Sequence, residues 1–370
     1  MPPSLQATLA TPVRWLTWLG DQGTRAVAAL VLFGIAIPPL GALLRPFVTE
    51  AIFLLLVISF MRVDLAALRA QLRRPGLIVA ATAWTTIGVP LIFGLAAHLT
   101  GFDARLPELF LALMLQAIAS PMMASPAIAA LMGLDATLVL VTLVTSTALV
   151  PFTASLFAAL FLAGTLSIPP LALGAKLLAI LAGSLLVATV IRWLFGTEAI
   201  QRQRRPIDGI NIIILLVFVA AVMGNVIADF LADPLLSIAI ALLAFAIFFA
   251  LLIVTTLLFR RIGYEQALAL GLMVSQRNLG LMLAATAGAL PGMTWLYFAL
   301  TQFPYYLAPQ MLTPIARRLT AQPQATSAAA AGGALRHDEP SSRGLYLRSR
   351  KQKGPNQQAR GKSEEPQGAG

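Results

Sequence analysis

The chain has 370 residues, of which 58% are hydrophobic and 11% are charged, with a formal net charge of +11 and a mean hydropathy of +0.84. Soluble domains carry about a quarter charged residues, so this composition excludes an ordinary soluble protein and indicates a polytopic membrane protein. The arginines lie between apolar runs and in the C-terminal region, which argues against nucleic acid as a partner. Cysteine is absent and the only histidines are His98 and His337, which excludes disulfides and histidine–cysteine metal sites.

The N-terminal segment, 1–26, contains "PVRWLTWLG", whose tryptophan spacing is typical of an interfacial helix, and we expect no cleaved signal peptide. Ten apolar runs follow, each near the roughly 20 residues that a helix needs to cross a bilayer. We expect one transmembrane helix in each run. The C-terminal segment, 319–370, is polar and basic, and we expect it to be a disordered cytoplasmic tail. The runs are 27–44, 47–61, 75–99, 106–132, 135–164, 168–195, 210–231, 234–259, 265–290 and 294–315.

Arginines concentrate in every second loop, and the opposite loops hold little basic charge beyond Arg45 and Arg105. By the positive-inside rule, the arginine-rich loops and both termini are therefore expected in the cytoplasm. The sequence thus predicts a multi-pass protein of a bacterial-type cytoplasmic (inner) membrane. The arginines follow runs two, six, eight and ten and are Arg69, Arg73, Arg74, Arg202, Arg204, Arg205, Arg260, Arg261, Arg317 and Arg318.

Runs four and nine are interrupted. Run four contains Pro121 and Pro126, each of which removes a backbone donor, and run nine contains the polar sequence "SQRN" at 275–278. Irregular backbone at membrane depth occurs only where protein or a water-filled cavity covers it. Both runs are fourth in a set of five, which predicts an all-α protein with two inverted five-helix repeats, 27–164 and 165–318, and a midplane binding site.

Arg277 is the unusual residue of run nine. A guanidinium at the bilayer centre costs at least about 2.5–3.5 kcal/mol, so it needs a partner or a cavity, and the acidic residues all fall at the ends of runs. One interpretation is structural: carbonyls at the helix break, Gln116 or Ser125 bind Arg277, or its side chain reaches the interface. The other interpretation is that Arg277 binds an organic anion, because arginine stays protonated and grips a carboxylate with two hydrogen bonds.

Three stretches resemble the bile acid/sodium symporter family, whose kin include arsenite efflux carriers. They are "RVDLAALRAQLRRPG", "ASPAIAALMGLDATLVLVTLVTSTALVP" and "QRNLGLMLAA". The resemblance covers about residues 27–318. It implies a panel domain of runs one, two, six and seven, and a core domain of the other runs in which broken helices four and nine cross. It also implies alternating access by movement of one domain against the other.

The resemblance does not carry the sodium sites of that family over to this chain. The positions that hold sodium ligands in the family fall here on Pro126, Met273, Arg277, Val139 and Leu143, although Asn278 is kept. A hard cation needs several oxygen ligands. We therefore expect no metal and no cofactor, with sodium left as an alternative, and we expect Arg277 to stand where relatives place a sodium ion.

We therefore expect a secondary transporter of small organic anions that works by alternating access, with the anion and the lipid bilayer as its partners. It is not expected to be an enzyme. The alternatives left open are a receptor or structural protein that keeps a transporter fold, and a membrane-embedded enzyme. The candidate substrate-binding residues at the crossover are Gln116, Ser120, Ser125, Pro126, Gln276, Arg277 and Asn278.

Overall fold

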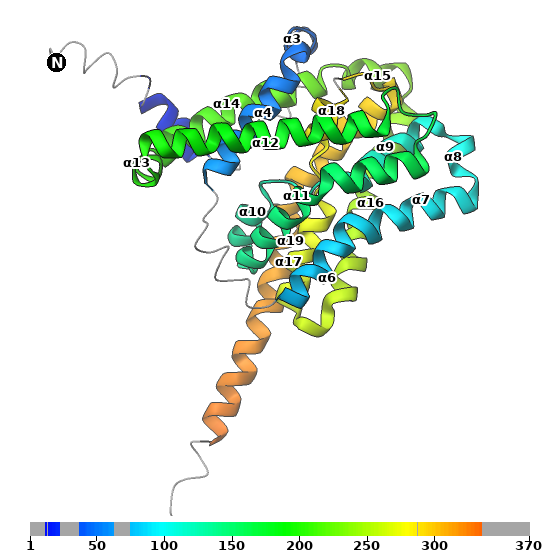
Figure 1. Ribbon diagram of the computed structural model, residues 1–370. Helices are drawn as coiled ribbons and strands as arrows, with labels where there is room; N and C mark the ends of the chain where they lie inside the picture. Colours follow the sequence, from blue (N-terminus) through cyan, green and yellow to red (C-terminus); the bar gives the residue numbers. More distant parts are fainter. Residues whose placement is uncertain (1–11, 13, 23–36, 63–74, 287, 335–370) are drawn as a thin grey trace, which may run out of the picture. The chain divides into compact units, whose positions relative to one another are not determined.

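The computed structural model describes residues 12, 14–22, 37–62, 75–286 and 288–334 (Figure 1). These residues are helical apart from short connections, and within them no strand forms beyond one isolated bridge between Pro121 and Arg277. The prediction of an all-α protein is confirmed. The chain forms two compact units, 1–323 and 324–370. Of the second unit the structure describes only 324–334, which are helical, and the paragraphs below concern the first.

Residues 14–21 are helical, as expected for the N-terminal segment. The elements of the first half are α3 (Pro38–Leu44), the 3₁₀ turn η1 (Arg45–Phe47), α4 (Val48–Met61), α6 (Pro75–Ala83), the π-helix η2 (Trp84–Gly88), α7 (Val89–Thr100), α8 (Phe102–Arg105), α9 (Pro107–Ile118), α10 (Ser125–Leu131) and α11 (Ala136–Phe161). Those of the second half are α12 (Pro170–Phe195), α13 (Thr197–Arg202), α14 (Arg204–Met223), α15 (Val226–Ala232), α16 (Pro234–Phe259), the 3₁₀ turn η3 (Arg260–Ile262), α17 (Tyr264–Ser275), α18 (Leu279–Ala285) and α19 (Gly292–Ala334).

Six helical stretches in the described part of the chain are long and apolar enough to cross a membrane, so the protein is of the membrane-embedded class. They are Pro38–Met61, Pro75–Thr100, Ala136–Phe161, Pro170–Phe195, Arg204–Ala232 and Pro234–Ile262. Runs four and nine do not appear among them because each is divided into two short helices, α9 with α10 and α17 with α18. The predicted interruption of both runs is confirmed.

Two predicted boundaries differ from the structure. Run one was expected to be one helix over 27–44, but α3 begins at Pro38, because two successive prolines lack N–H groups and fit only a helix start; residues 27–36 lie outside the described part. Run seven, predicted over 210–231, lies within the apolar stretch Arg204–Ala232, in which Gly224 and Asn225 separate α14 from α15. The α19 helix continues through 319–334, where the disordered tail was expected to begin; this segment is rich in alanine, the best helix former.

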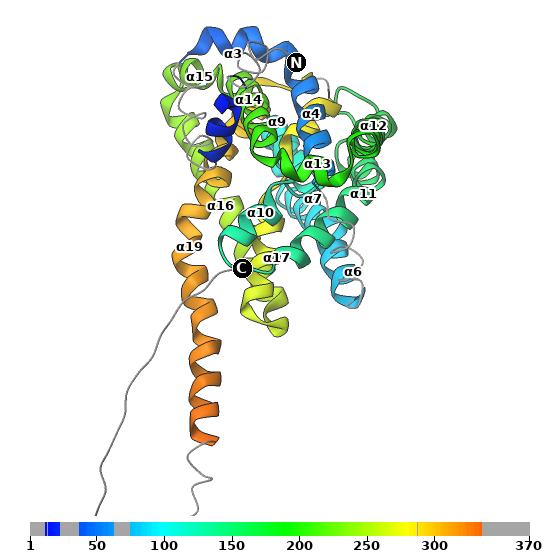
Figure 2. The ribbon, with the colours of Figure 1, turned by 90° about the vertical axis from the view of Figure 1, so that its left-hand side faces the viewer.

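The α12 helix shows how the apolar surface divides between protein and lipid. It packs beside α11 and against α4 (Figure 1 and Figure 2). Leu171, Leu178 and Leu185 are exposed at a spacing of seven residues, whereas Leu177 and Leu181 are buried. A stripe of exposed leucines on one face of a helix is unfavourable in water and suits the hydrocarbon of a bilayer. The face against α4 and α11 therefore belongs to the core, and the opposite face is available to lipid.

The α3 and α14 helices approach each other closely where Gly41 meets Gly224. A Cβ atom built on Gly41 would overlap the Cα atom of Gly224 and lie 2.7 Å from the Ala220 carbonyl oxygen. Both obstacles are backbone, which cannot rotate away as a side chain can. Small residues allow membrane helices to pack at such short distances, so this contact sets the separation of the two helices.

We predict that Gly41→Ala lowers the free energy of unfolding by about 1–3 kcal/mol, because overpacking forces the two backbones apart. Thermal unfolding of the purified protein in detergent measures the change. Gly76→Ala is the matched control, since no atom lies within 4 Å of a Cβ built on Gly76 in the first turn of α6. Equal melting temperatures for the two variants would contradict the contact.

Candidate functional site

The breaks in runs four and nine cross and hydrogen-bond to each other through their main chains. The Met122 N–H donates to the Gln276 carbonyl at 2.8 Å, and the Asn278 N–H donates to the Ser120 carbonyl at 2.8 Å. These bonds flank the bridge between Pro121 and Arg277. Backbone groups at membrane depth must find partners inside the protein, and here each break supplies them for the other.

The second half-helices begin immediately beyond the crossing. The Asn278 side chain accepts a hydrogen bond from the Leu281 N–H at 3.1 Å and caps α18. Pro126 lies in the first turn of α10, where a missing N–H costs nothing. The expectation that Pro126 interrupts the helix is therefore wrong: Pro121 lies in the break, and Pro126 starts the helix that follows it.

Arg277 is buried at the crossover, with 1% of its surface exposed. Its Nη1 atom donates to the Ala119 carbonyl at 3.0 Å and to the Thr85 carbonyl at 3.2 Å. No carboxylate lies within 4 Å of the guanidinium in the part of the chain that the structure describes. The Ala119 carbonyl at the helix break is thus a partner of Arg277, as the structural interpretation expected. Gln116 and Ser125 do not bind the guanidinium. The Arg277 side chain is enclosed by protein and does not extend to the surface.

The Thr85 carbonyl is available to Arg277 because of the π-helix η2. In this segment the Val89 N–H donates to the Trp84 carbonyl, five residues earlier. The same register would pair Thr85 with residue 90, which is Pro90 and has no N–H. The carbonyl is therefore left without a helical partner, and the guanidinium satisfies it. The signal in the sequence was Pro90 within run three, but nothing there points to a residue 192 positions away.

Two donors of the Arg277 guanidinium, Nε and Nη2, have no hydrogen-bond partner among the described residues although both are buried. Five buried hydroxyls of the described residues share this property: Ser120, Thr142, Ser146, Thr147 and Ser237. An unpartnered donor on a buried charge is costly, with a typical penalty of more than about 1–3 kcal/mol. The buried guanidinium therefore carries two donors for which the described residues supply no acceptor.

A second network ties the crossover to α19. Gln116 in α9 accepts a hydrogen bond from the Tyr297 hydroxyl and donates to the Tyr305 hydroxyl at 3.1 Å. Gln276 donates to the Tyr305 carbonyl at 3.1 Å and accepts from the Ser125 hydroxyl at 3.3 Å. Gln116, Ser125 and Gln276 therefore hold the two broken helices against α19 and do not face a ligand.

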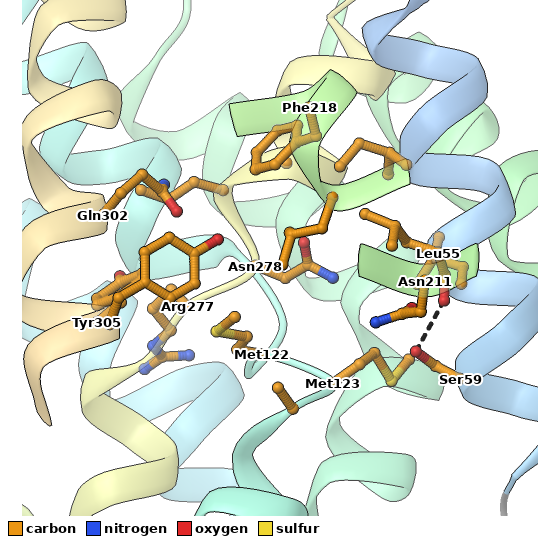
Figure 3. Close-up of a pocket in the computed structure, with 17 residues that line it drawn as sticks. Leu55, Ser59, Met122, Met123, Asn211, Phe218, Arg277, Asn278, Gln302 and Tyr305 are labelled. Atoms are coloured by element: carbon orange, nitrogen blue, oxygen red, sulfur yellow. Dashed lines mark hydrogen bonds between the residues drawn. The ribbon is translucent and has the colours of Figure 1, made fainter. Parts of the chain in front are cut away.

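A cavity of about 140 Å³ adjoins the crossover (Figure 3). Of the seven predicted site residues only Arg277 and Asn278 line it. Its other polar residues are Ser59, Asn211, Gln302, Tyr305 and Tyr306, none of which was among those seven. The rest of the wall is apolar and consists of Ile52, Leu55, Leu56, Met122, Met123, Leu215 and Phe218 with smaller contributions from Ala124, Leu279 and Gly280. The cavity thus combines a polar side at the crossover with an apolar side along α4 and α14.

Several acidic residues of the described chain bond to groups at helix ends or in loops. Asp135 caps α11 and Asp233 caps α16, and Asp208 forms a 2.7 Å ion pair with Arg62. In the loop around α8, the hydrogen bond between His98 and Asp103 lowers the pKa of the Asp103 carboxyl. These carboxylates are therefore committed to helix ends and loops.

The positions at which the resemblance places sodium ligands do not form an oxygen cage. Met273, Val139 and Leu143 are buried in the apolar core, and Pro126 offers no side-chain oxygen. No group of three histidine, cysteine, aspartate or glutamate side chains that could hold a metal occurs within the described residues. The guanidinium of Arg277 is the cation that the carbonyls of this crossover contact.

No protein-family model matches the chain, and no curated protein matches it. The resemblance to the bile acid/sodium symporter family therefore rests on the three quoted stretches and stays a prediction. The geometry of the crossover stands independently of it.

We predict that Gln116→Leu lowers the free energy of unfolding by about 1–3 kcal/mol for each tyrosine hydroxyl that it leaves without a partner. The melting temperature in detergent reports the loss. Gln201→Leu, at an exposed site in α13, controls for removal of an amide and is expected to change the melting temperature little. A fall no larger in Gln116→Leu than in this control would show that the network does not stabilise the fold.

Proposed function

We propose that the protein is a secondary transporter that moves small organic anions across a membrane by alternating access. The observation that carries the proposal is the buried Arg277, which has no carboxylate partner within the described chain, two unused donors and a place in the wall of the crossover cavity. A permanent cation at membrane depth persists only with a partner or a function. A carboxylate on a substrate supplies both the missing charge and the missing acceptors.

The chemistry of the cavity favours a small acid. A guanidinium presents a planar fork that matches a carboxylate. Asn211, Asn278 and Gln302 add neutral amides that can orient polar groups of a substrate, and the leucines of α4 can contact its carbon skeleton. At about 140 Å³, the cavity in this conformation suits molecules smaller than a typical drug, whose pockets have volumes of about 300–1,000 Å³.

The broken helices support transport rather than fixed binding. Discontinuous helices that meet at the midplane are a recurrent feature of transporters with inverted repeats. We propose that α9–α10 and α17–α18 are the corresponding helices of two five-helix repeats, and that a core domain built around them moves against a panel domain that includes α4, α12 and α14. The arginine-rich loops favour cytoplasmic termini in a bacterial-type inner membrane.

We also propose that transport does not depend on sodium. Unwound carbonyls at helix breaks coordinate sodium in many transporters. In this chain Arg277 donates to one such carbonyl, of Ala119, and to the Thr85 carbonyl in the π-helix η2. A tethered guanidinium then performs the electrostatic role of a diffusible ion, and no ion gradient is required to complete the site.

We predict that Arg277→Gln slows uptake of the transported acid by about 10- to 150-fold, the effect of losing a hydrogen bond to a charged group. The measurement is initial uptake by proteoliposomes of a panel of radiolabelled monocarboxylates that includes benzoate and 2-oxobutyrate. The variant removes the charge and keeps a neutral amide donor at position 277.

Arg260→Gln is the matched control, because Arg260 is exposed at the end of α16, and this variant is expected to transport at the wild-type rate. Monodisperse elution of each variant checks folding. Binding without accumulation inside the vesicles would favour a receptor over a transporter. Equal uptake by wild-type protein and Arg277→Gln, or no uptake of any acid, would refute the proposed function.

We predict that replacing sodium with choline on both sides of the vesicle leaves the uptake rate unchanged, because Arg277 already contacts the crossover carbonyls. Uptake measured in the two buffers at equal ionic strength tests this. Uptake that requires sodium would show that the guanidinium does not replace a cation.

A further inference from the structure

A second arginine is held in place by an aromatic ring at the other end of α18. The Cζ atom of Arg45 lies 4.3 Å from the centroid of the Trp295 ring. The ring itself is fixed, because Trp295 is 9% exposed and its Nε1 donates to the Gly288 carbonyl at 3.3 Å. A cation over an indole face is attracted by the ring quadrupole, so the guanidinium is positioned without a carboxylate.

The charge of Arg45 is not neutralised within the described chain. Other arginines pair with acids: Arg62 with Asp208 at 2.7 Å and Arg205 with Asp21 at 3.6 Å. Arg45 has no such ion pair among the described residues and is exposed. The stacked ring covers a face of the guanidinium, while its N–H donors lie in the guanidinium plane and stay free to bind an anion.

Arg45 lines two adjoining cavities of about 340 and 350 Å³, which share Ala42, Arg45 and Trp295. The larger one also contains Asp229, whose carboxylate repels an anion. The smaller one has Arg45 as its only charged residue among the described residues that line it, together with the Thr49 hydroxyl. An anion therefore fits the smaller cavity, which we call the α3–α18 cavity.

The α3–α18 cavity and the crossover cavity lie along the same pair of helices. Val48 and Thr49 of α4 and Leu283 of α18 line the first. Ile52 of α4 and Gly280 of α18 line the second. Val48 and Ile52 are one helical turn apart, so the two cavities are successive spaces along the seam between α4 and α18.

A narrow contact separates the two spaces. A Cβ atom built on Gly280 would overlap the Ile52 Cδ1 atom and lie 3.2 Å from the Phe218 Cζ atom. Ile52, Gly280 and Phe218 thus fill the seam between Arg45 and Arg277. Because Gly280 has no side chain, it obstructs the seam less than any other residue would.

We propose that Arg45, held by Trp295, forms a second carboxylate-binding site in the α3–α18 cavity, and that a substrate passes between this site and Arg277 along the α4–α18 seam. The passage rests on the proposed transport function, whereas the binding site does not. In this conformation the contact of Ile52 with Gly280 closes the seam, so the two arginines face separate spaces.

Quenching of tryptophan fluorescence by 4-bromobenzoate tests the binding site, because bromine quenches an indole only at short range. The full-length protein in detergent is titrated with this probe and with 4-bromobenzamide, a neutral molecule of similar shape. We expect saturable quenching by the acid alone.

Arg45→Gln should raise the half-quenching concentration at least about tenfold, as expected for a lost charge-assisted hydrogen bond. Trp295→Phe should remove the saturable signal. Arg105→Gln, at an exposed arginine of α8, is the control and should titrate as wild type.

Equal quenching by the acid and the amide would overturn the site, as would a wild-type titration of Arg45→Gln. Arg277→Gln should keep the Arg45-dependent quenching. If wild-type vesicles take up no acid but quenching depends on Arg45, the transport function fails and the binding site stands. If vesicles take up acids and quenching does not depend on Arg45, the site fails and the transport function stands.

Gly280→Ala tests the passage, because the added methyl group fills the seam. We expect it to reduce uptake of radiolabelled benzoate at least tenfold, with quenching by 4-bromobenzoate unchanged. The double variant Ile52→Ala with Gly280→Ala makes room for the methyl group and should recover uptake. Wild-type uptake by Gly280→Ala, or a double variant as slow as Gly280→Ala, would show that the substrate does not pass along this seam.

Discussion

The hydrogen bonds from the Arg277 guanidinium to two main-chain carbonyls organise the crossover. One carbonyl, of Ala119, ends a half-helix, and the other, of Thr85, is released by the π-helix of a different run. Arg277 therefore links runs three, four and nine. The main-chain hydrogen bonds between the breaks link only runs four and nine. Because these carbonyls lie at depth, a neutral side chain would leave at least one of them without a partner.

The nitrogens of the Arg277 guanidinium are not equally hydrogen-bonded. Nη1 is satisfied, whereas Nε and Nη2 are buried without partners in the described structure. Buried charges that are only partly hydrogen-bonded are unfavourable. The structural and the functional interpretations of Arg277 are therefore compatible: one nitrogen of the guanidinium fixes the fold, and the proposed function assigns the two unpartnered donors to a ligand.

Local chemistry allowed the sequence to predict the breaks but not their partners. Pro121 and the polar residues around Arg277 disrupt a helix wherever it is placed, so their effect is readable from neighbouring residues. The Thr85 carbonyl becomes a partner only because two distant segments meet. The same holds for Asn211, which looks like an isolated polar residue until folding brings it to the cavity. Pro126 was misread because a proline breaks a continuing helix but is well placed in the first turn of a new one.

The wide turn at Trp84–Gly88 also has a geometric consequence. A π-turn accommodates one residue more than an α-turn, and each residue of an α-helix rotates the chain by about 100°. The extra residue therefore sets which side of α7 looks inward relative to α6. Loss of one residue from this turn would leave a regular and well-bonded helix, yet it would rotate the whole of α7 about its axis. A chain shortened in this way could insert into a bilayer normally and still present the wrong surface to its neighbours.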